Sequence, residues 1–173
     1  MYPMIEPIGI ELQRRVLAAT EHYFGEAEKI FGRKFERIPV LFDLRGTSAG
    51  MYKVFGKRRW IRYNPWIFAK YYDINLRDTV PHEVAHFVVD DVYNKHAKPH
   101  GQEWQALMAL FDSDPCVTFN LDLSGIPKRQ QRTHTYRCHC DTHEVSTTRH
   151  NRVLRGRGIY CCKNCDGKLL YAG

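Results

Sequence analysis

The sequence predicts an α+β fold, in which helices pack on a small β-sheet, followed by a short C-terminal module. Stretches with helical and strand periodicity occur in mixed order over the first 125 residues. An apolar content of 43%, with 13% aromatic residues, is enough for a hydrophobic core. Residues 1–125 carry 16 Lys or Arg and 16 Asp or Glu, whereas residues 126–173 carry 10 and 3. We therefore expect a first domain at 1–125, a basic linker at 126–137 and a second module at 138–173.

Local patterns predict the first elements of the domain. Residues 9–31 place apolar side chains at a helical period, which indicates an amphipathic helix. Three short apolar runs, bounded by glycine, proline or polar residues, predict strands, and Gly56 with Lys57 predicts a hairpin turn between the last two. A short helix is expected to follow. The predicted strands span residues 39–44, 50–56 and 58–64, and the short helix spans residues 65–72.

Two further helices carry the polar residues of most interest. We expect Asp78 to cap the first of them, because an Asp side chain can accept a hydrogen bond from a free N–H group of a first turn. Pro81 is tolerated within that turn. The helix continues through Val92 with an apolar stripe on one side. The second helix is predicted from Gly101 to Phe111, with Trp104 among its buried residues.

Residues 82–86 read His-Glu-Val-Ala-His, which is an H-E-x-x-H pattern. On a helix, His82 and His86 project from the same face about one turn apart, a separation that suits two imidazole ligands of one zinc ion. Glu83 lies beside the first ligand, where a general base can take a proton from an activated water. The alternative is a solvated helix face. Because the other side of this helix is predicted to be buried, we interpret the pattern as a zinc site.

A catalytic zinc site needs a third protein ligand, and two histidines compete for the role. His96 lies near the end of the first helix, where it can simply complement the helix dipole. His100 lies between Pro99 and Gly101, where the chain turns back toward that helix, so we favour His100. Glu103 is a candidate for orienting a ligand, although an acidic residue at a helix N-terminus needs no such role.

The C-terminal module contains five of the six cysteines. The chain has no apolar run of about 18 residues and no secretory signal pattern, so we expect a cytoplasmic, reducing environment and metal-bound thiolates rather than disulfides. Cys162 and Cys165 have the two-residue spacing of a zinc-binding pair, and Cys138 with Cys140 supplies the second pair. A module this short cannot bury enough apolar surface on its own, which favours a structural zinc.

Two residues leave the details of this cysteine site open. The Cys138-x-Cys140 pair is one residue shorter than usual, so His143 is an alternative ligand in place of one cysteine. Cys161 lies directly beside Cys162 and competes with it. Cys116, outside the module, is predicted to be an ordinary buried thiol.

Basic and aromatic residues separate the two cysteine pairs. Arginine interleaved with tyrosine is the composition expected of a surface that follows a phosphate backbone and stacks bases. A solvated basic hairpin is the alternative, and the turn at residues 57–60 is a weaker candidate for the same surface. The predicted nucleic-acid-binding residues are Arg149, Arg152, Arg155, Arg157 and Tyr160.

Six segments, in order, resemble the SprT family of zincin-like metalloproteins over nearly the whole chain. They are RGTSAG (45–50), VPHEVAHFVV (80–89), KPHGQEW (98–104), YRCHC (136–140), RHNRVLRG (149–156) and YCCKNC (160–165). The resemblance implies a zincin-like metalloprotease domain followed by a zinc ribbon. It also implies that His82, His86 and His100 bind zinc and that Glu83 is catalytic. A eukaryotic relative, Spartan, is a DNA-dependent protease acting on proteins crosslinked to DNA.

Together these observations predict a monomeric zinc metallopeptidase with one catalytic and one structural zinc. Its expected partners are DNA, single-stranded or at a junction, and a protein substrate bound or crosslinked to DNA. The edge strand around residues 45–53 is the predicted place for an extended substrate to pair. The alternative function is a catalytically silent regulatory protein that binds zinc and nucleic acid.

Overall fold

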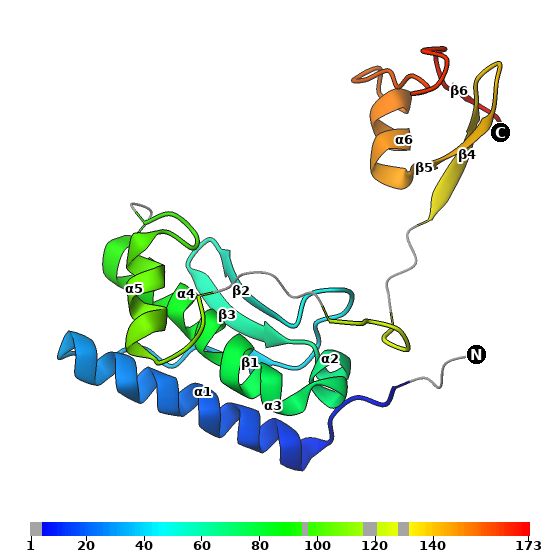
Figure 1. Cartoon of the computed structure of the whole chain (residues 1–173). Coiled ribbons are helices and arrows are strands. Elements are labelled where there is room, and N and C mark those ends of the chain that lie inside the picture. The colour runs from blue at the N-terminus through cyan, green and yellow to red at the C-terminus, as the bar shows by residue number, and fades with distance from the viewer. Residues whose placement is uncertain (1–4, 95–96, 116–120, 128–131) are drawn as a thin grey trace. The chain divides into compact units, whose positions relative to one another are not determined.

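The computed structural model describes residues 5–94, 97–115, 121–127 and 132–173. The chain divides into two compact units, Met1–Lys128 and Arg129–Gly173 (Figure 1). We call the second unit the C-terminal module. Its first strand, β4, begins at Thr133. Part of the segment predicted as a linker, 126–137, is therefore a strand. In the described part of the chain, no helix is both long and apolar enough to cross a membrane.

The first unit is built on a long helix and a three-stranded sheet. Helix α1 (Ile10–Phe31) ends at Gly32, whose φ of 62° is in the left-handed region that favours glycine. The strands are β1 (Val40–Leu41), β2 (Gly50–Phe55) and β3 (Arg58–Tyr63), in the spatial order β1-β3-β2. Strand β1 pairs with β3 in parallel and β2 pairs with β3 in antiparallel register. The predicted hairpin through Gly56 is present, whereas the strand expected at 39–44 shortens to two residues.

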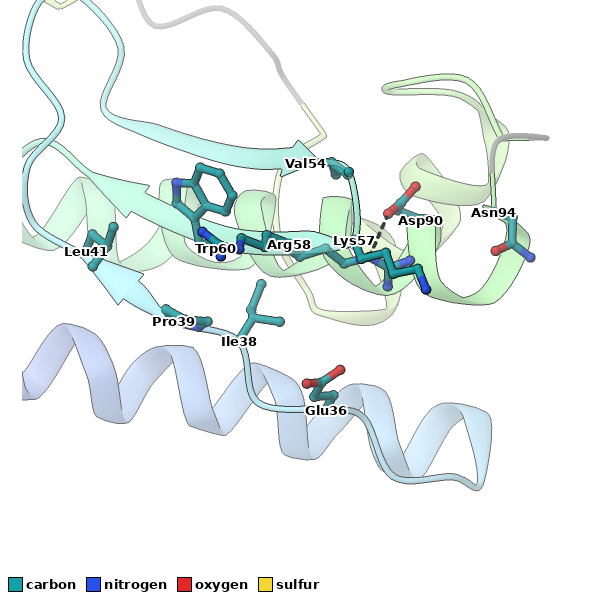
Figure 2. A pocket seen from close by; sticks show the side chains of 12 residues that line it. Glu36, Ile38, Pro39, Leu41, Val54, Lys57, Arg58, Trp60, Asp90 and Asn94 are labelled. Atoms are coloured by element: carbon teal, nitrogen blue, oxygen red, sulfur yellow. Dashed lines mark ion pairs between the residues drawn. The ribbon is translucent and has the colours of Figure 1, made fainter.

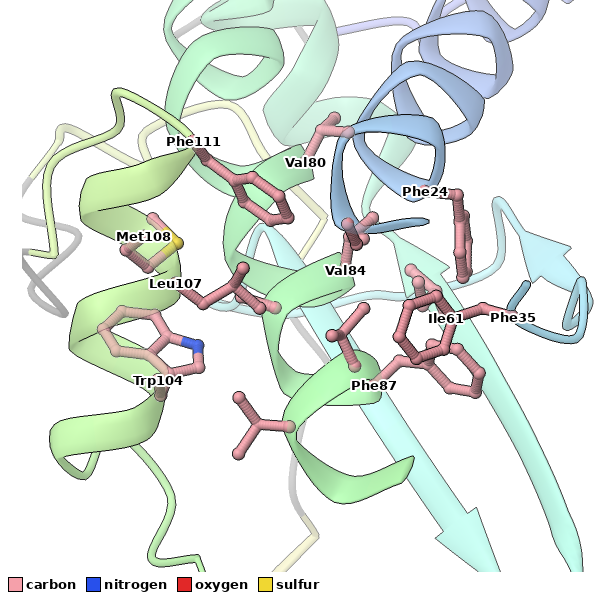
Figure 3. Packing of buried hydrophobic residues seen from close by; sticks show 14 of the residues in the cluster. Phe24, Phe35, Ile61, Val80, Val84, Phe87, Trp104, Leu107, Met108 and Phe111 are labelled. Atoms are coloured by element: carbon pink, nitrogen blue, oxygen red, sulfur yellow. The ribbon is translucent and has the colours of Figure 1, made fainter. Parts of the chain in front are cut away.

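One face of the sheet belongs to the core. Ile61 and Tyr63 alternate along β3 and are fully buried, and the Tyr63 hydroxyl lies 3.1 Å from the Thr20 hydroxyl on α1. Figure 3 shows aromatic residues of α1 and α4 meeting beside Ile61. Phe24 and Phe87 make an edge-to-face contact there, with ring centroids 5.3 Å apart. These contacts fix α4 against both α1 and the sheet.

The segment leading into α4 corrects one prediction. Helix α2 (Pro65–Lys70) is capped by Asn64, whose side chain accepts from two backbone N–H groups. After it come α3 (Tyr72–Ile74), a π-helical turn η1 (Asn75–Thr79) and α4 (Val80–Tyr93). Asp78 is not an N-cap, because it lies inside η1 and pairs with Arg77 instead. The backbone is already helical when it reaches Val80, whose N–H donates to the Asn75 carbonyl, so no side-chain cap is required.

Helix α5 (Gln102–Leu110) begins after Gly101 and packs against α4. Its buried residues join the main core, as Figure 3 shows for Trp104, Leu107 and Met108. This packing sets the start of α5, and with it the Pro99-His100 turn, beside α4.

The C-terminal module has its own small core. Its strands are β4 (Thr133–Arg137), β5 (Thr142–Ser146) and β6 (Leu170–Tyr171), in the order β5-β4-β6, and helix α6 (Thr147–Leu154) follows β5. The sequence patterns did not predict α6. The buried core consists of Tyr136, Val145, Cys162 and Leu169. A core of this size is too small to stabilise a fold by hydrophobic burial alone.

Candidate metal centres

Helix α4 presents two half-buried histidines on one face while its other side is in the core. Val84, Phe87 and Val88 are at most 1% exposed, which fixes the rotation of the helix. His82 and His86 are one turn apart on α4, and their Nε2 atoms lie 3.1 Å from each other.

His100 completes a cluster of three imidazoles. Its Nε2 lies 2.9 Å from that of His86 and 3.1 Å from that of His82. The backbone of His100 has a φ of 56°, a left-handed conformation that is uncommon for a residue with a side chain and is often found at functional sites. The structure thus brings together the three histidines that the sequence pattern grouped. The competing candidate, His96, lies outside the described residues.

The cluster suits a zinc ion. Three imidazole nitrogens cannot all donate hydrogen bonds to one another, because a neutral imidazole carries one proton on its two nitrogens. Burial lowers the pKa of His82 to about 4 and that of His86 to about 3, so both rings are neutral at pH 7 with a free lone pair. An ion about 2.0–2.1 Å from each nitrogen fits over a triangle of this size, with a further position left open.

Trp104 supports the three rings and was missed as a site residue. The sequence pattern assigned it only to the core, where it is 1% exposed. Its ring centroid lies 4.7 Å from those of His82 and His100 and 5.5 Å from that of His86. Its indole N–H also donates to the His82 carbonyl at 3.4 Å. Because His100 precedes α5 and has a left-handed backbone, helical spacing could not have predicted this contact.

Glu83 is buried beside the histidine cluster and has one described hydrogen-bond partner. Its Oε2 accepts a hydrogen bond of 2.6 Å from the backbone N–H of Tyr52 on strand β2. Burial raises the pKa of Glu83 to about 8, while this hydrogen bond acts in the opposite direction. A carboxyl group with a pKa near neutrality can both accept and release a proton at physiological pH.

Gly50 leaves the space that Glu83 occupies. A Cβ atom at this position would lie 2.6 Å from Glu83 Oε1, 2.7 Å from Glu83 Cγ and 2.7 Å from Thr79 Cγ2. Such distances are too short for any side chain, so the close approach of β2 to α4 requires glycine. Glycine in a strand often marks such an approach, which is the signal that the sequence offered.

Glu103 lies in the first turn of α5, as expected. Its Oε2 is 3.3 Å from where a Gly101 side chain would begin. Within the described ranges, no hydrogen bond connects this carboxylate to a histidine, so the geometry favours the helix-terminus role over that of orienting a ligand.

Four cysteines form a second candidate metal site, in the C-terminal module. The sulfur atoms of Cys138, Cys140, Cys162 and Cys165 all lie within 4.8 Å of one another. The Cys138–Cys140 and Cys140–Cys162 distances are 3.4 Å and 3.6 Å. Four thiolates about 2.3 Å from one ion in tetrahedral geometry would have similar spacing, so the group suits zinc.

Two residues next to the four-cysteine group, His143 and Cys161, differ in how they contact it. His143 Nε2 lies 3.2 Å from Cys138 Sγ, where it can donate a hydrogen bond to a thiolate, and this interaction raises the pKa of His143. Cys161 is exposed and lies outside the four-cysteine group, since its backbone instead bridges to Lys168. Cys116 lies outside the described residues.

The predicted nucleic-acid-binding residues fall on and after α6. The Arg149 guanidinium lies over the Tyr160 ring, 5.5 Å from its centroid. Arg152 donates a hydrogen bond to the Arg157 carbonyl at 3.2 Å, which ties the end of α6 to the following turn. The side chains of Arg149, Arg152, Arg155 and Arg157 are all exposed.

Comparison with known proteins identifies the family. The SprT-like family model matches residues 20–123, a range that contains the three histidines and Glu83. The chain is 36% identical over 162 residues to Protein SprT of Shewanella oneidensis, covering 93% of this chain and all of that protein. It is 33% identical over 167 residues to Protein SprT of Vibrio parahaemolyticus, covering 96% of this chain and 98% of that protein. The chain belongs to the SprT-like family.

We expect His100→Ala to empty the histidine site selectively. Because two imidazoles hold zinc more weakly than three, metal analysis should find about one zinc per chain in the purified variant and about two in the parent. The four-cysteine site should keep its ion. If His96→Ala removes this zinc and His100→Ala does not, the assignment of the third ligand is wrong.

We expect adjacent cysteines to respond differently to substitution by serine. Cys162→Ser should release the zinc of the C-terminal module and unfold it, because Cys162 is both in the four-cysteine group and in the small core. Cys161→Ser should change neither zinc content nor thermal unfolding. Equal damage from both variants, measured by metal analysis and circular dichroism, would contradict the assignment.

Proposed function

We propose that the protein is a zinc-dependent peptidase that acts on proteins bound or crosslinked to nucleic acid. The observation that carries the proposal is the position of Glu83, which directly follows His82 on α4 and whose buried carboxyl group is hydrogen-bonded to strand β2. A carboxyl group whose burial raises its pKa, next to a convergent imidazole cluster, is the arrangement expected of a general base in metal-assisted hydrolysis.

Each group has a role in this proposal. His82, His86 and His100 would hold the zinc ion, which supplies Lewis acidity and lowers the pKa of water. A Glu83 carboxylate oxygen takes the proton from the attacking water and later passes it to the leaving amine nitrogen. Trp104 keeps the imidazoles oriented and excludes water from one side of the cluster.

Strand β2 is the proposed binding edge for the substrate. In the described structure it pairs with β3 on one side only, and the Tyr52 N–H points away from β3 toward Glu83. An extended peptide that adds to this edge would therefore run past the general base. Strand addition uses backbone groups and so tolerates many substrate sequences. The predicted pairing segment, 45–53, comprises the loop before β2 and the first residues of β2.

The proposed nucleic-acid contact of the C-terminal module uses exposed cations and one aromatic ring. The Arg149–Tyr160 pair offers a charge beside a stacking surface, and Arg155 and Arg157 extend the positive charge along the following turn. Residues 126–173 also contain 10 basic and only 3 acidic residues. Together these features support binding to a phosphate backbone.

The decisive experiment compares the parent protein with Glu83→Gln. The assay is cleavage of a basic DNA-binding protein, with and without single-stranded DNA. Glu83→Gln should keep both zinc ions and full DNA binding but lose about 10²–10⁴-fold in turnover, because the amide cannot accept the proton. Charge reversal at Arg155 and Arg157 should weaken DNA binding and its salt dependence. If the parent is as inert as Glu83→Gln under all conditions, the silent regulatory role replaces the peptidase.

A second variant tests the geometry of the base without removing it. Gly50→Ala places a methyl group in the space of the Glu83 carboxylate, so this side chain must shift. A displacement of about 1 Å can reduce turnover by about 10²-fold. We expect that loss with the zinc content unchanged, and the Gly25→Ala variant, at an open helical position, is the matched control. Parent-level turnover in Gly50→Ala would show that the close approach is not needed.

A further inference from the structure

The first unit, which is neutral overall, has a strongly basic region around its hairpin. Residues 44–72 contain seven Lys or Arg and no Asp or Glu. Three of these cations have carboxylate partners elsewhere in the unit: Arg59 with Asp90 and Asp91, Arg62 with Asp43, and Lys70 with Asp122. Of the other four, Arg45 lies over the Trp66 ring, and within the described residues no ion pair involves Lys53, Lys57 or Arg58. These three charges therefore remain available to a ligand.

The strand register puts aromatic and basic side chains on the same open face of the sheet. Residues directly opposite in an antiparallel pair share a face, and Lys53 is opposite Trp60 while Phe55 is opposite Arg58. Ile61 and Tyr63 are buried on the other face, so this set points away from the core. Phe55 is 73% exposed, so its ring is accessible to a ligand on this face.

A groove adjoins this face at the part of β3 that β1 does not cover. It has a volume of about 860 Å³, and its lining includes Ile38, Pro39, Leu41 and Trp60, with Lys57 and Arg58 along it (Figure 2). Lys53 Nζ lies 5.8 Å from the Trp60 ring centroid, so a cation and an aromatic ring stand together. Two acidic residues, Glu36 and Asp90, also line the groove; Asp90 is already bonded to Tyr52 and Arg59, and Glu36 is exposed at the side of the groove opposite Trp60's strand, on the segment before β1.

We propose that this sheet face and its groove form a binding site for single-stranded nucleic acid, separate from the C-terminal module. Bases stack on Trp60 and Phe55, and phosphates contact Lys53, Lys57 and Arg58. Aromatic residues on an exposed sheet face, flanked by cations, are a general solution for binding unpaired bases. An acidic peptide would satisfy the cations but leave the two aromatic rings without a partner, so the combination favours a nucleic acid.

The site does not depend on peptidase activity, because it is defined by binding alone. It would hold a single strand on the same unit that carries the histidine cluster. If the binding test fails, the peptidase proposal is unaffected. If the parent protein proves to have no peptidase activity, the binding-site proposal is unaffected.

The test is fluorescence anisotropy of a labelled single-stranded oligodeoxythymidine with the full-length protein at several salt concentrations. All variants carry Arg155→Glu and Arg157→Glu, so that the C-terminal module contributes less. Trp60→Leu should weaken binding at least about fivefold, because one base no longer stacks, and Trp60→Phe should restore most of the affinity. Lys57→Glu with Arg58→Glu should lower affinity and reduce the salt slope by about 0.7 for each phosphate that these cations no longer neutralise.

The matched control reverses two exposed charges on α1, Arg14→Glu with Lys29→Glu, for the same change in net charge; their ion pairs with Glu11 and Glu26 are on the surface and contribute little to stability. It should bind within about twofold of the parent, and zinc content and thermal unfolding should be unchanged in every variant. Three results would overturn the proposal: an equal reduction of affinity in the α1 control, parent-level binding by Trp60→Leu, or displacement of the oligonucleotide by polyglutamate at equal charge. Each would show a surface that responds to charge and not to bases.

Discussion

The burial of one side of α4 governs the geometry of the histidine cluster. Val84 and Val88 are fully buried, and Phe87 packs against Phe24 of α1 and Tyr52 of β2. A helix packed this tightly cannot rotate without exposing apolar surface or creating a void. A single large-to-small substitution in a core costs about 2–5 kcal/mol, so we expect such a rotation to cost at least as much. The burial of the opposite side of the helix therefore holds the two histidines of α4 toward His100 at the start of α5.

The same packing leaves Glu83 in an environment that is costly for a charge. Its carboxylate receives the Tyr52 N–H from a strand about 30 residues earlier in the chain, and Gly50 provides the space for it. One backbone hydrogen bond does not offset the loss of hydration, so the pKa rises to about 8. Stability and the protonation of Glu83 are linked here, because the core that fixes α4 also raises the pKa of its carboxyl group. The π-helical turn η1 before α4 contributes Thr79, whose side chain lies with Glu83 in the space that Gly50 leaves open.

The two units are stabilised in different ways. The first has a continuous core from α1 to α5 and remains neutral overall. The C-terminal module buries few apolar residues, and one of them, Cys162, is also a candidate metal ligand. A metal ion in the cysteine group would thus contribute directly to folding. The C-terminal module has a surplus of positive charge, and so does the hairpin of the first unit. In both units these charges lie on the surface and take no part in the hydrophobic core.

The amino-acid sequence by itself determined which residues are grouped, because the reasoning depended on local spacing. His82 and His86 on one helix face, the cysteine pairs and the hairpin at Gly56 all follow from short-range geometry. Tertiary structure decided the rest. Asp78 lost its predicted capping role because the chain enters α4 through η1, and α6 formed in a segment with few apolar residues. The contacts of Trp104 with the histidines, of Glu83 with Tyr52, and the shared face of Lys53 and Trp60 depend on packing or strand register. Such contacts join residues distant in the sequence, and no local pattern specifies them.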